Sequence, residues 1–216
     1  MTTKRTTRRL LACGVVAAPL FFAVAFGLAL TRDGFDLSRH MISQLATGHL
    51  GWLQVANFLT TGGLYVACAV GMRHAGVGTW GPRLVGTFGV ALVAAGVFVT
   101  DPAGGFPPQA TNTAISWHGV VHGVAAVAAG LALLATAVVL ARRFAAHNHK
   151  GWAAVSAASG VLYLVIPWAI PRLGGWGLAV ASIVGWGWLS ATAGRLLGHP
   201  TATPDPSAPD PALQPA

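Results

Sequence analysis

Apolar residues fill six runs of the chain that are each long enough to cross a lipid bilayer. A transmembrane helix needs about 17–25 predominantly apolar residues, and the breaks between the runs are rich in Gly, Pro, Arg and Asp. The six runs are 10–30, 53–72, 84–100, 118–140, 152–170 and 174–197. An isolated segment satisfies its own backbone groups in lipid only as a helix. The pattern therefore predicts an all-α, polytopic membrane protein with six transmembrane helices.

The composition agrees with a membrane protein and excludes an ordinary soluble domain. Hydrophobic residues make up 54% of the 216-residue chain and charged residues only 8%, against about 25% charged residues in a typical soluble domain. The first apolar run, 10–30, is longer than the roughly 7–15 apolar residues of a signal peptide. We expect it to be retained as the first span.

Lys and Arg residues indicate the orientation of the spans. Of the thirteen, ten lie on the side that carries both chain ends, and only Arg32, Arg39 and Arg172 lie on the other. Cytoplasmic loops carry an excess of Lys and Arg, so both termini are predicted to be cytoplasmic. The high Ala, Gly and Val content, with Arg outnumbering Lys eleven to two, is typical of a GC-rich bacterial genome and favours a bacterial plasma membrane.

The net charge of +8 is explained by this topology and by attraction to anionic membrane lipid. A nucleic-acid partner is not indicated, because no basic face with interleaved aromatic residues is present. Residues 1–9 are predicted to form a basic cytoplasmic tail and residues 10–197 the six-helix transmembrane domain. Residues 198–216, rich in Pro and polar residues, are predicted to be a disordered cytoplasmic tail.

The first outer loop, 31–51, is long for a connector and has a helical pattern. Asp36 can cap the start of a helix and Gly48 can end it, while Leu37, Met41 and Leu45 repeat every four residues. This pattern predicts a short amphipathic helix at the outer interface. Its opposite face carries three polar candidates for a site: Arg39, His40 and Ser43.

Polar residues of three further segments lie at the same outer depth. The second span carries three of them at spacings of three and four residues, which places them on one helix face. The third span ends at Asp101, and the fourth begins with His118 and His122. We predict a polar pocket at the outer leaflet, since ionisable residues at a membrane edge mark functional sites. Its expected ligand-binding residues are Asp36, His40, Gln54, Asn57 and Thr61.

A purely structural role is the alternative for these residues. Amides and hydroxyls in membrane helices commonly form hydrogen bonds between helices, and Asp101-Pro102 can simply terminate the third span. The two histidines have a second interpretation as metal ligands, because a pair at i and i+4 can chelate one ion from a single helix face. Asp101, Asp36 or His40 would supply the third ligand to zinc or another divalent transition metal.

The absence of glutamate from the chain argues against a metalloprotease motif, and hydrogen-bonded structural histidines remain the alternative to a metal site. Haem is disfavoured, because residues on one helix face cannot occupy opposite axial positions of one iron. A metal-dependent hydrolase of lipid-like substrates would use His118 and His122 as ligands and Asp101 as third ligand or base. Ser43 or Arg39 would then orient the substrate.

Three function classes follow from these patterns. The first is a protein that binds a membrane lipid, a lipid-like or small-molecule ligand, or a membrane partner, and the lack of an obvious nucleophile favours it. The second is the metal-dependent hydrolase. The third is a small transporter, which is disfavoured because no charged residue lies in the middle of a span.

Several local motifs, taken together, resemble one family. Ile42-Ser43-x-Leu45 is followed by Gly51-Trp52-Leu53-Gln54-x-x-Asn57-Phe58, then by Asp101-Pro102, then by His118-Gly119-x-x-His122. This combination resembles a family of bacterial multi-pass membrane proteins catalogued as a domain of unknown function, number nine hundred and ninety-eight. The resemblance covers roughly residues 10–197. It implies a compact helical membrane fold and a site formed by these outer residues, without an established reaction.

Overall fold

The computed structural model describes residues 2–108, 110, 114–169 and 173–198, and these residues form helices without a β-strand. The elements are α1 (Thr2–Thr31), the 3-10 helix η1 (Ile42–Ala46), α2 (Gly51–His74), α3 (Trp80–Val97), α4 (Trp117–Ala146), α5 (Lys150–Ala169) and α6 (Gly175–Gly198). All six α-helices are long and apolar enough to cross a membrane. The prediction of an all-α, six-helix, multi-pass membrane protein is confirmed.

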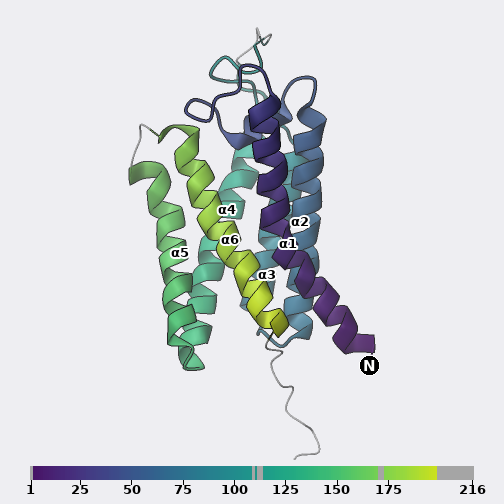
Figure 1. Cartoon of the computed structure of the whole chain (residues 1–216), viewed down its shortest axis with the longest axis vertical. Helices are drawn as coiled ribbons and strands as arrows, with labels where there is room; N and C mark the ends of the chain where they lie inside the picture. Colours follow the sequence, from purple (N-terminus) through teal and green to yellow (C-terminus); the bar gives the residue numbers. More distant parts are fainter. Residues whose placement is uncertain (1, 109, 111–113, 170–172, 199–216) are drawn as a thin grey trace, which may run out of the picture.

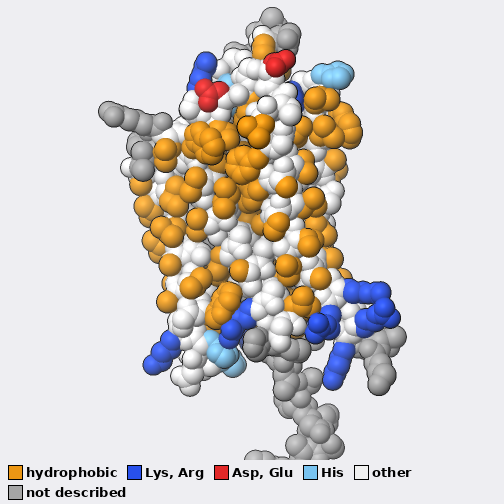
Figure 2. Space-filling model, viewed as in Figure 1, with side chains coloured by type: hydrophobic (Ala, Val, Ile, Leu, Met, Phe, Trp, Pro, Cys, Tyr) orange, Lys and Arg blue, Asp and Glu red, His pale blue; other side chains and the backbone are white. Residues whose placement is uncertain are grey.

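The helices form a ring in chain order (Figure 1). Each packs against the next, and α1 packs against α6 to close the ring. We call the end that carries residues 32–50, 98–108 and 114–116 the capped end, and the opposite end, where α1 begins and α6 finishes, the basic end. Figure 2 shows the acidic side chains at the capped end, most of the Lys and Arg at the basic end, and an apolar band between them.

Aromatic side chains fill the centre of the ring. The Trp186 ring lies 4.6 Å from that of Phe21 and 5.3 Å from that of Phe88, centroid to centroid. Phe58 adds an edge-to-face contact to Phe21 at 5.2 Å, the geometry that aromatic pairs prefer. All four side chains are buried. They form a packed floor below the capped half of the molecule.

The first loop differs in detail from the predicted amphipathic helix. It contains a short helix, but this is the five-residue 3-10 helix η1 rather than an α-helix. Leu37 and Leu45 are buried whereas Met41 is 44% exposed, so the three do not form one apolar stripe. The side chain of Gln44 explains the difference, since it accepts a hydrogen bond from the Met41 amide (2.7 Å) and donates one to the Ala103 carbonyl (2.8 Å).

The two predicted tails have different outcomes. Helix α1 already begins at Thr2, so the described part of the basic segment 1–9 continues the first span as a helix. The Pro-rich tail predicted over 198–216 lies outside the described residues from residue 199 onwards.

Candidate functional site

His40 connects the first loop to the loop that contains Gly104 at the capped end. Its Nδ1 accepts a hydrogen bond from the Asp36 amide at 2.9 Å, so the proton of the neutral ring is on Nε2. Nε2 then donates to the Gly104 carbonyl at 3.0 Å. The side chain is only 1% exposed. Because both ring nitrogens are engaged within the protein, His40 joins the two loops of the capped end and has no nitrogen left for a ligand.

The two described carboxylates that were predicted for the site also stabilise local backbone. Asp36 accepts a hydrogen bond from the Ser38 amide at 2.8 Å, and hydrogen bonds from Ser38 lower the pKa of its carboxyl group. Asp101 accepts one from the Ser116 amide at 2.9 Å. Hydrogen bonds from the Ser116 side chain and backbone lower the pKa of Asp101. Ser116 itself caps α4 by accepting from the Gly119 amide.

Two arginines form hydrogen bonds with backbone carbonyls at the capped end. Arg39 donates to the Gly104 carbonyl at 3.1 Å, next to the bond from His40. Arg32, which was not among the predicted site residues, donates to the carbonyls of Leu45 (3.2 Å) and Thr47 (2.8 Å). Together with Gln44, these contacts make a tightly bonded lid from the first loop and residues 98–106.

The predicted polar face of α2 is buried against α1. Asn57 donates to the Phe21 carbonyl at 3.0 Å and to Gln54 Oε1 at 3.2 Å. Three buried atoms of this face, Gln54 Nε2, Asn57 Oδ1 and Thr61 Oγ1, have no hydrogen-bond partner among the described residues. Such groups are usually satisfied by buried water. Asn57 of this face therefore joins α2 to α1. A hydrogen bond between helices is the structural role predicted from the sequence as the alternative to ligand binding.

A cavity of about 260 Å³ lies beneath the lid, inside the ring. Its roof is Met41, Ile42 and Ser43, and its floor is the aromatic cluster that contains Phe21, Phe58 and Trp186. The remaining described lining residues come mainly from α4 and α6 and are mostly small or apolar, and none of them is charged. This is the character of a pocket for an apolar ligand with a few polar contacts.

His122 is one of the polar groups at this cavity. Its Nδ1 lies 2.9 Å from the Ala95 carbonyl and 3.0 Å from the Phe98 carbonyl at the end of α3. Carbonyl oxygens only accept, so Nδ1 carries the proton and Nε2 of the neutral ring is an acceptor. The side chain is 7% exposed and lines the cavity. His122 thus anchors α4 to α3, and its side chain also lines the cavity.

Trp186 supplies the complementary donor. Its side chain is 6% exposed and lines the cavity, and its indole Nε1 has no hydrogen-bond partner among the described residues. A buried indole N–H normally finds a partner. The neighbouring Trp188 follows this rule by donating to Ser156 Oγ at 3.1 Å.

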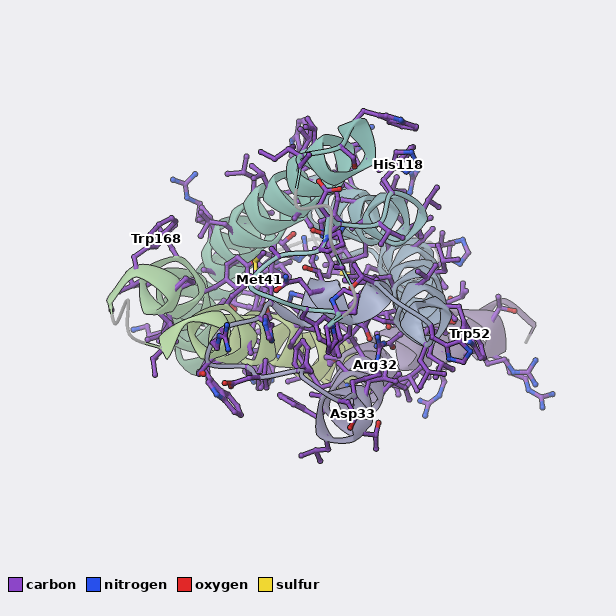
Figure 3. All side chains as sticks on the ribbon, turned by 90° about the horizontal axis from the view of Figure 1, so that it is seen from above. Arg32, Asp33, Met41, Trp52, His118 and Trp168 are labelled. Atoms are coloured by element: carbon purple, nitrogen blue, oxygen red, sulfur yellow. The ribbon has the colours of Figure 1, made fainter. Side chains whose placement is uncertain are left out.

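The exposed part of the cavity lining lies on the first loop, α4 and α6. The exposed residues of its lining are Met41, Gly123, Ala126 and Leu178, and Figure 3 shows Met41 between the ribbons of α4 and α6. Gly123 and Ala126 lie six and nine residues into α4, about 9–14 Å from its first residue. That distance is shorter than the roughly 30 Å hydrocarbon layer of a bilayer, so these exposed positions lie within the part of α4 that is apolar enough to span a membrane.

Comparison with known protein families gives a match over residues 15–203 to the family described as "Protein of unknown function (DUF998)". The chain belongs to this family. The match runs from within α1 to beyond the end of α6, so it includes the lid and the cavity alike. No curated protein and no solved structure matches the chain.

The predicted metal ligands lie near one another, since the charges of His118 and His122 help to lower the pKa of the Asp101 carboxyl group, but the described side chains are not placed to hold one ion. His118 is exposed and lies against Trp117, with ring centroids 3.7 Å apart and ring planes tilted by 51°, and Figure 3 places it on the outer side of the ring. His122 is bonded to α3, and Asp101 is bonded to the start of α4. Among the described residues, no group of three or more His, Cys, Asp or Glu side chains is placed to hold a metal ion.

Of the predicted site residues, Ser43 and His122 line the cavity, whereas Gln54, Asn57, Thr61, His40 and Asp36 do not. Trp186 was not among them. A signal for Trp186 is present in the sequence, because it lies in the middle of an apolar run. A tryptophan at that depth, away from the interface where its N–H is hydrated, needs a partner inside the protein.

Proposed function

We propose that this protein binds a lipid-like molecule in the cavity between α4 and α6. The observation that carries the proposal is a cavity of about 260 Å³ with an uncharged, mostly apolar lining that includes Trp186, whose buried indole N–H has no partner among the described residues. Leaving such a donor without a partner costs about 1–3 kcal/mol, and a ligand acceptor would remove that cost. We expect the exposed side of the lining to be the opening through which a ligand dissolved in the bilayer enters.

The lining favours a neutral polar head on an apolar chain. Trp186 requires an acceptor, and His122 Nε2 requires a donor. A hydroxyl or amide group provides both. The described lining contains no Lys or Arg to balance an anionic head and no carboxylate to balance a cationic one. Monoacylglycerols and long-chain alcohols therefore fit this site better than anionic phospholipids.

The orientation and location of the protein belong to the same proposal. The excess of Lys and Arg at the basic end supports a cytoplasmic position for that end and for both termini. The capped end and its cavity would then belong to the outer leaflet of a plasma membrane.

The proposal is tested by closing the opening. Gly123 is an exposed residue of the cavity lining, and a Cβ added to it would meet no atom within 4 Å, so Gly123→Leu adds bulk at the opening. Gly63 is also exposed, in α2, with free space around it, and lies outside the cavity. Gly63→Leu is therefore a matched control, because both changes remove a helical glycine and add the same side chain.

Saturable binding of radiolabelled 1-oleoylglycerol to the purified protein in neutral detergent is the measurement. We expect Gly123→Leu to abolish it and Gly63→Leu to leave it unchanged. His122→Asn keeps the donor to α3 but removes the acceptor Nε2, and a lost neutral hydrogen bond corresponds to about 3- to 10-fold weaker binding. Equal binding by wild type and Gly123→Leu, or equal loss in both leucine variants, would refute the proposal.

A further inference from the structure

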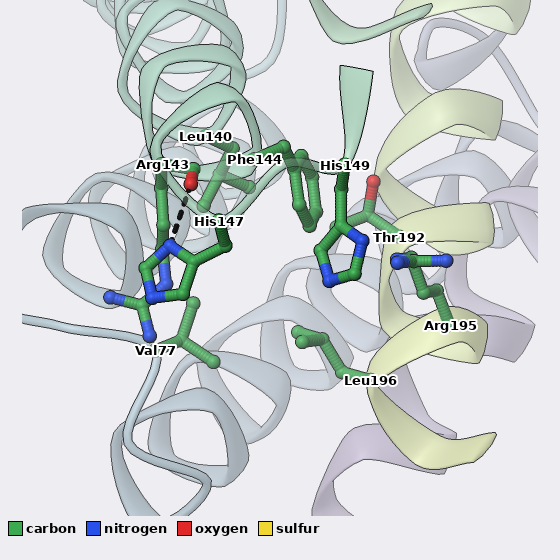
Figure 4. Close-up of a pocket in the computed structure, with 9 residues that line it drawn as sticks. All are labelled: Val77, Leu140, Arg143, Phe144, His147, His149, Thr192, Arg195 and Leu196. Atoms are coloured by element: carbon green, nitrogen blue, oxygen red, sulfur yellow. Dashed lines mark hydrogen bonds between the residues drawn. The ribbon is translucent and has the colours of Figure 1, made fainter. Parts of the chain in front are cut away.

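A second cavity lies at the basic end, where α4 finishes, α5 begins and α6 approaches its last turn (Figure 4). Its volume is about 80 Å³. One water molecule needs about 10–15 Å³ of such space, so the cavity has room for a group of a few heavy atoms. It is separate from the cavity under the lid, with which it shares none of its described lining residues.

The lining of this second cavity is basic. Arg143, His147, His149 and Arg195 contribute to it, and none of its described lining residues is acidic. The two histidines are exposed and lie at its mouth, whereas its deeper wall is apolar. Figure 4 shows the side chains of Arg143 and His147 on one side of the space and those of His149 and Arg195 on the other.

Both arginines are held in place by contacts that leave further donors available. Arg195 lies 5.2 Å above the ring of Trp152 and 5.7 Å from that of Phe144. Stacking uses the face of the guanidinium and leaves the N–H groups in its plane free to bind. Arg143 donates from Nη2 to the Gly76 carbonyl at 2.9 Å, which uses one of its five N–H donors.

Thr192 provides the observation that points to an occupant. It is 1% exposed and lines the cavity, and its Oγ1 has no hydrogen-bond partner among the described residues. A helical threonine commonly bonds to the carbonyl four residues earlier, as Thr136 does to Ala132 at 2.7 Å. Thr192 therefore has a hydroxyl without a partner on the buried side of the cavity, three residues before Arg195 on α6.

We propose that this cavity binds a phosphate-type anion, either the head group of an anionic phospholipid or free phosphate. Arg143 and Arg195 supply charge-assisted hydrogen bonds, which suit phosphate oxygens, and Thr192 supplies a neutral one. Basic pockets between membrane helices are well suited to lipid phosphate. The site is independent of the ligand proposed for the cavity under the lid, where no charged residue lines the wall.

Thr192→Val tests the site without disturbing the fold. Valine has nearly the shape of threonine, and the lost hydroxyl has no hydrogen-bond partner among the described residues, so the unfolding midpoint of the ligand-free protein should stay equal or rise. Anion binding should weaken by about 3- to 10-fold. A drop in the ligand-free midpoint that accounts for all of the lost binding would contradict the proposal.

Arg195→Gln tests the charge, with Arg83→Gln as its control. Arg83 also lies at the basic end and stacks on a tryptophan, 5.5 Å from the ring of Trp80, but it is not part of the cavity. Both changes remove one positive charge and a contact with a tryptophan ring, and Arg195→Gln also removes the contact with Phe144. Losing a charged hydrogen bond corresponds to roughly 10-fold or greater weakening, which we expect for Arg195→Gln alone.

Binding is measured on the full chain as the rise in unfolding midpoint with ligand, because a ligand of the native state stabilises it. One arm titrates inorganic phosphate against chloride at equal ionic strength in neutral detergent. The other compares nanodiscs of phosphatidylglycerol with nanodiscs of phosphatidylcholine. Stabilisation by phosphate alone identifies free phosphate, and stabilisation by phosphatidylglycerol alone identifies a lipid head group. No stabilisation in either arm, or equal losses in Arg195→Gln and Arg83→Gln, overturns the proposal.

Discussion

At the scale of single residues, two tryptophans of α6 have different hydrogen bonding. Trp188 donates to Ser156 Oγ at 3.1 Å, whereas Trp186 has no partner for its N–H among the described residues. Both are nearly fully buried, so replacement by phenylalanine removes a similar volume at each. Without added lipid, we expect Trp188→Phe to lower the free energy of unfolding by about 1 kcal/mol more than Trp186→Phe. Reversible unfolding in detergent measures the difference, and equal losses would contradict it.

Asp101 gives the capped end a dependence on pH. Hydrogen bonds from Ser116 lower its pKa in the folded protein, so the ionised group stabilises the fold at neutral pH. This contribution is lost as the pH falls from the unfolded-state pKa, about 3.9, through the lower folded value. We expect Asp101→Asn to be less stable than wild type at neutral pH and to approach it on acidification below about pH 4. Unfolding midpoints across that range measure this, with Asp33→Asn as a control that removes the same charge from an exposed position.

The sequence locates the polar residues along the chain but not their partners. His118 and His122 differ by one helical turn, and only the second meets carbonyls of another helix, at sequence separations of 27 and 24 residues. Gly119 and Gly123 form a Gly-x-x-x-Gly pattern, which is typical of close contacts between membrane helices. Instead, Gly119 makes room for the carboxylate of Asp101, and Gly123 adjoins open space. The positions of polar residues along the helices can therefore be predicted from the sequence. Which of them face a common site depends on contacts between residues far apart in the sequence.

At the scale of helix pairs, α2 and α3 meet through two glycines. A Cβ added to Gly62 would lie 2.6 Å from the Gly89 carbonyl oxygen, and one added to Gly89 would lie 2.6 Å from that of Gly62. We expect Gly62→Ala to destabilise the protein by about 1–3 kcal/mol, because the backbones must separate. Gly63→Ala, at the next residue in open space, should be neutral or stabilising. Unfolding free energies in detergent distinguish the two, and similar values would exclude a tight contact.

A side chain of α6 forms hydrogen bonds with backbone groups of α1 just before Pro19. Proline opens the helix that precedes it, and α1 bends near its middle in Figure 1. Ser190 Oγ donates to the Gly14 carbonyl at 2.7 Å and accepts from the Ala18 amide at 3.3 Å. We expect Ser190→Ala to cost about 1 kcal/mol. The cost should shrink in a Pro19→Ala background, where α1 can close its own hydrogen bonds, and a double-mutant cycle of unfolding free energies tests this coupling.

The six helices could be predicted from the sequence because lipid requires every span to be long and apolar. The residues at which the helices end were predicted less accurately. Helix α4 continues to Ala146 through Arg142 and Arg143, since long basic side chains can extend toward water from the end of a span. The lid could not be predicted from local pattern, because Gln44 fixes it through a carbonyl 59 residues away.

At the scale of the whole molecule, the uneven charge predicts which end faces the cytoplasm. Ten of thirteen Lys and Arg residues lie at one end, so we expect the basic end inside. The native Cys68 is buried and Cys13 half-buried, both within helices, so wild type should react little with a membrane-impermeant maleimide. In intact cells, His49→Cys at the exposed capped end should be labelled, whereas Ala146→Cys at the exposed basic end should be labelled only after permeabilisation. The reverse pattern would invert the topology and place the basic cavity in the outer leaflet, away from the anionic lipid that its charge favours.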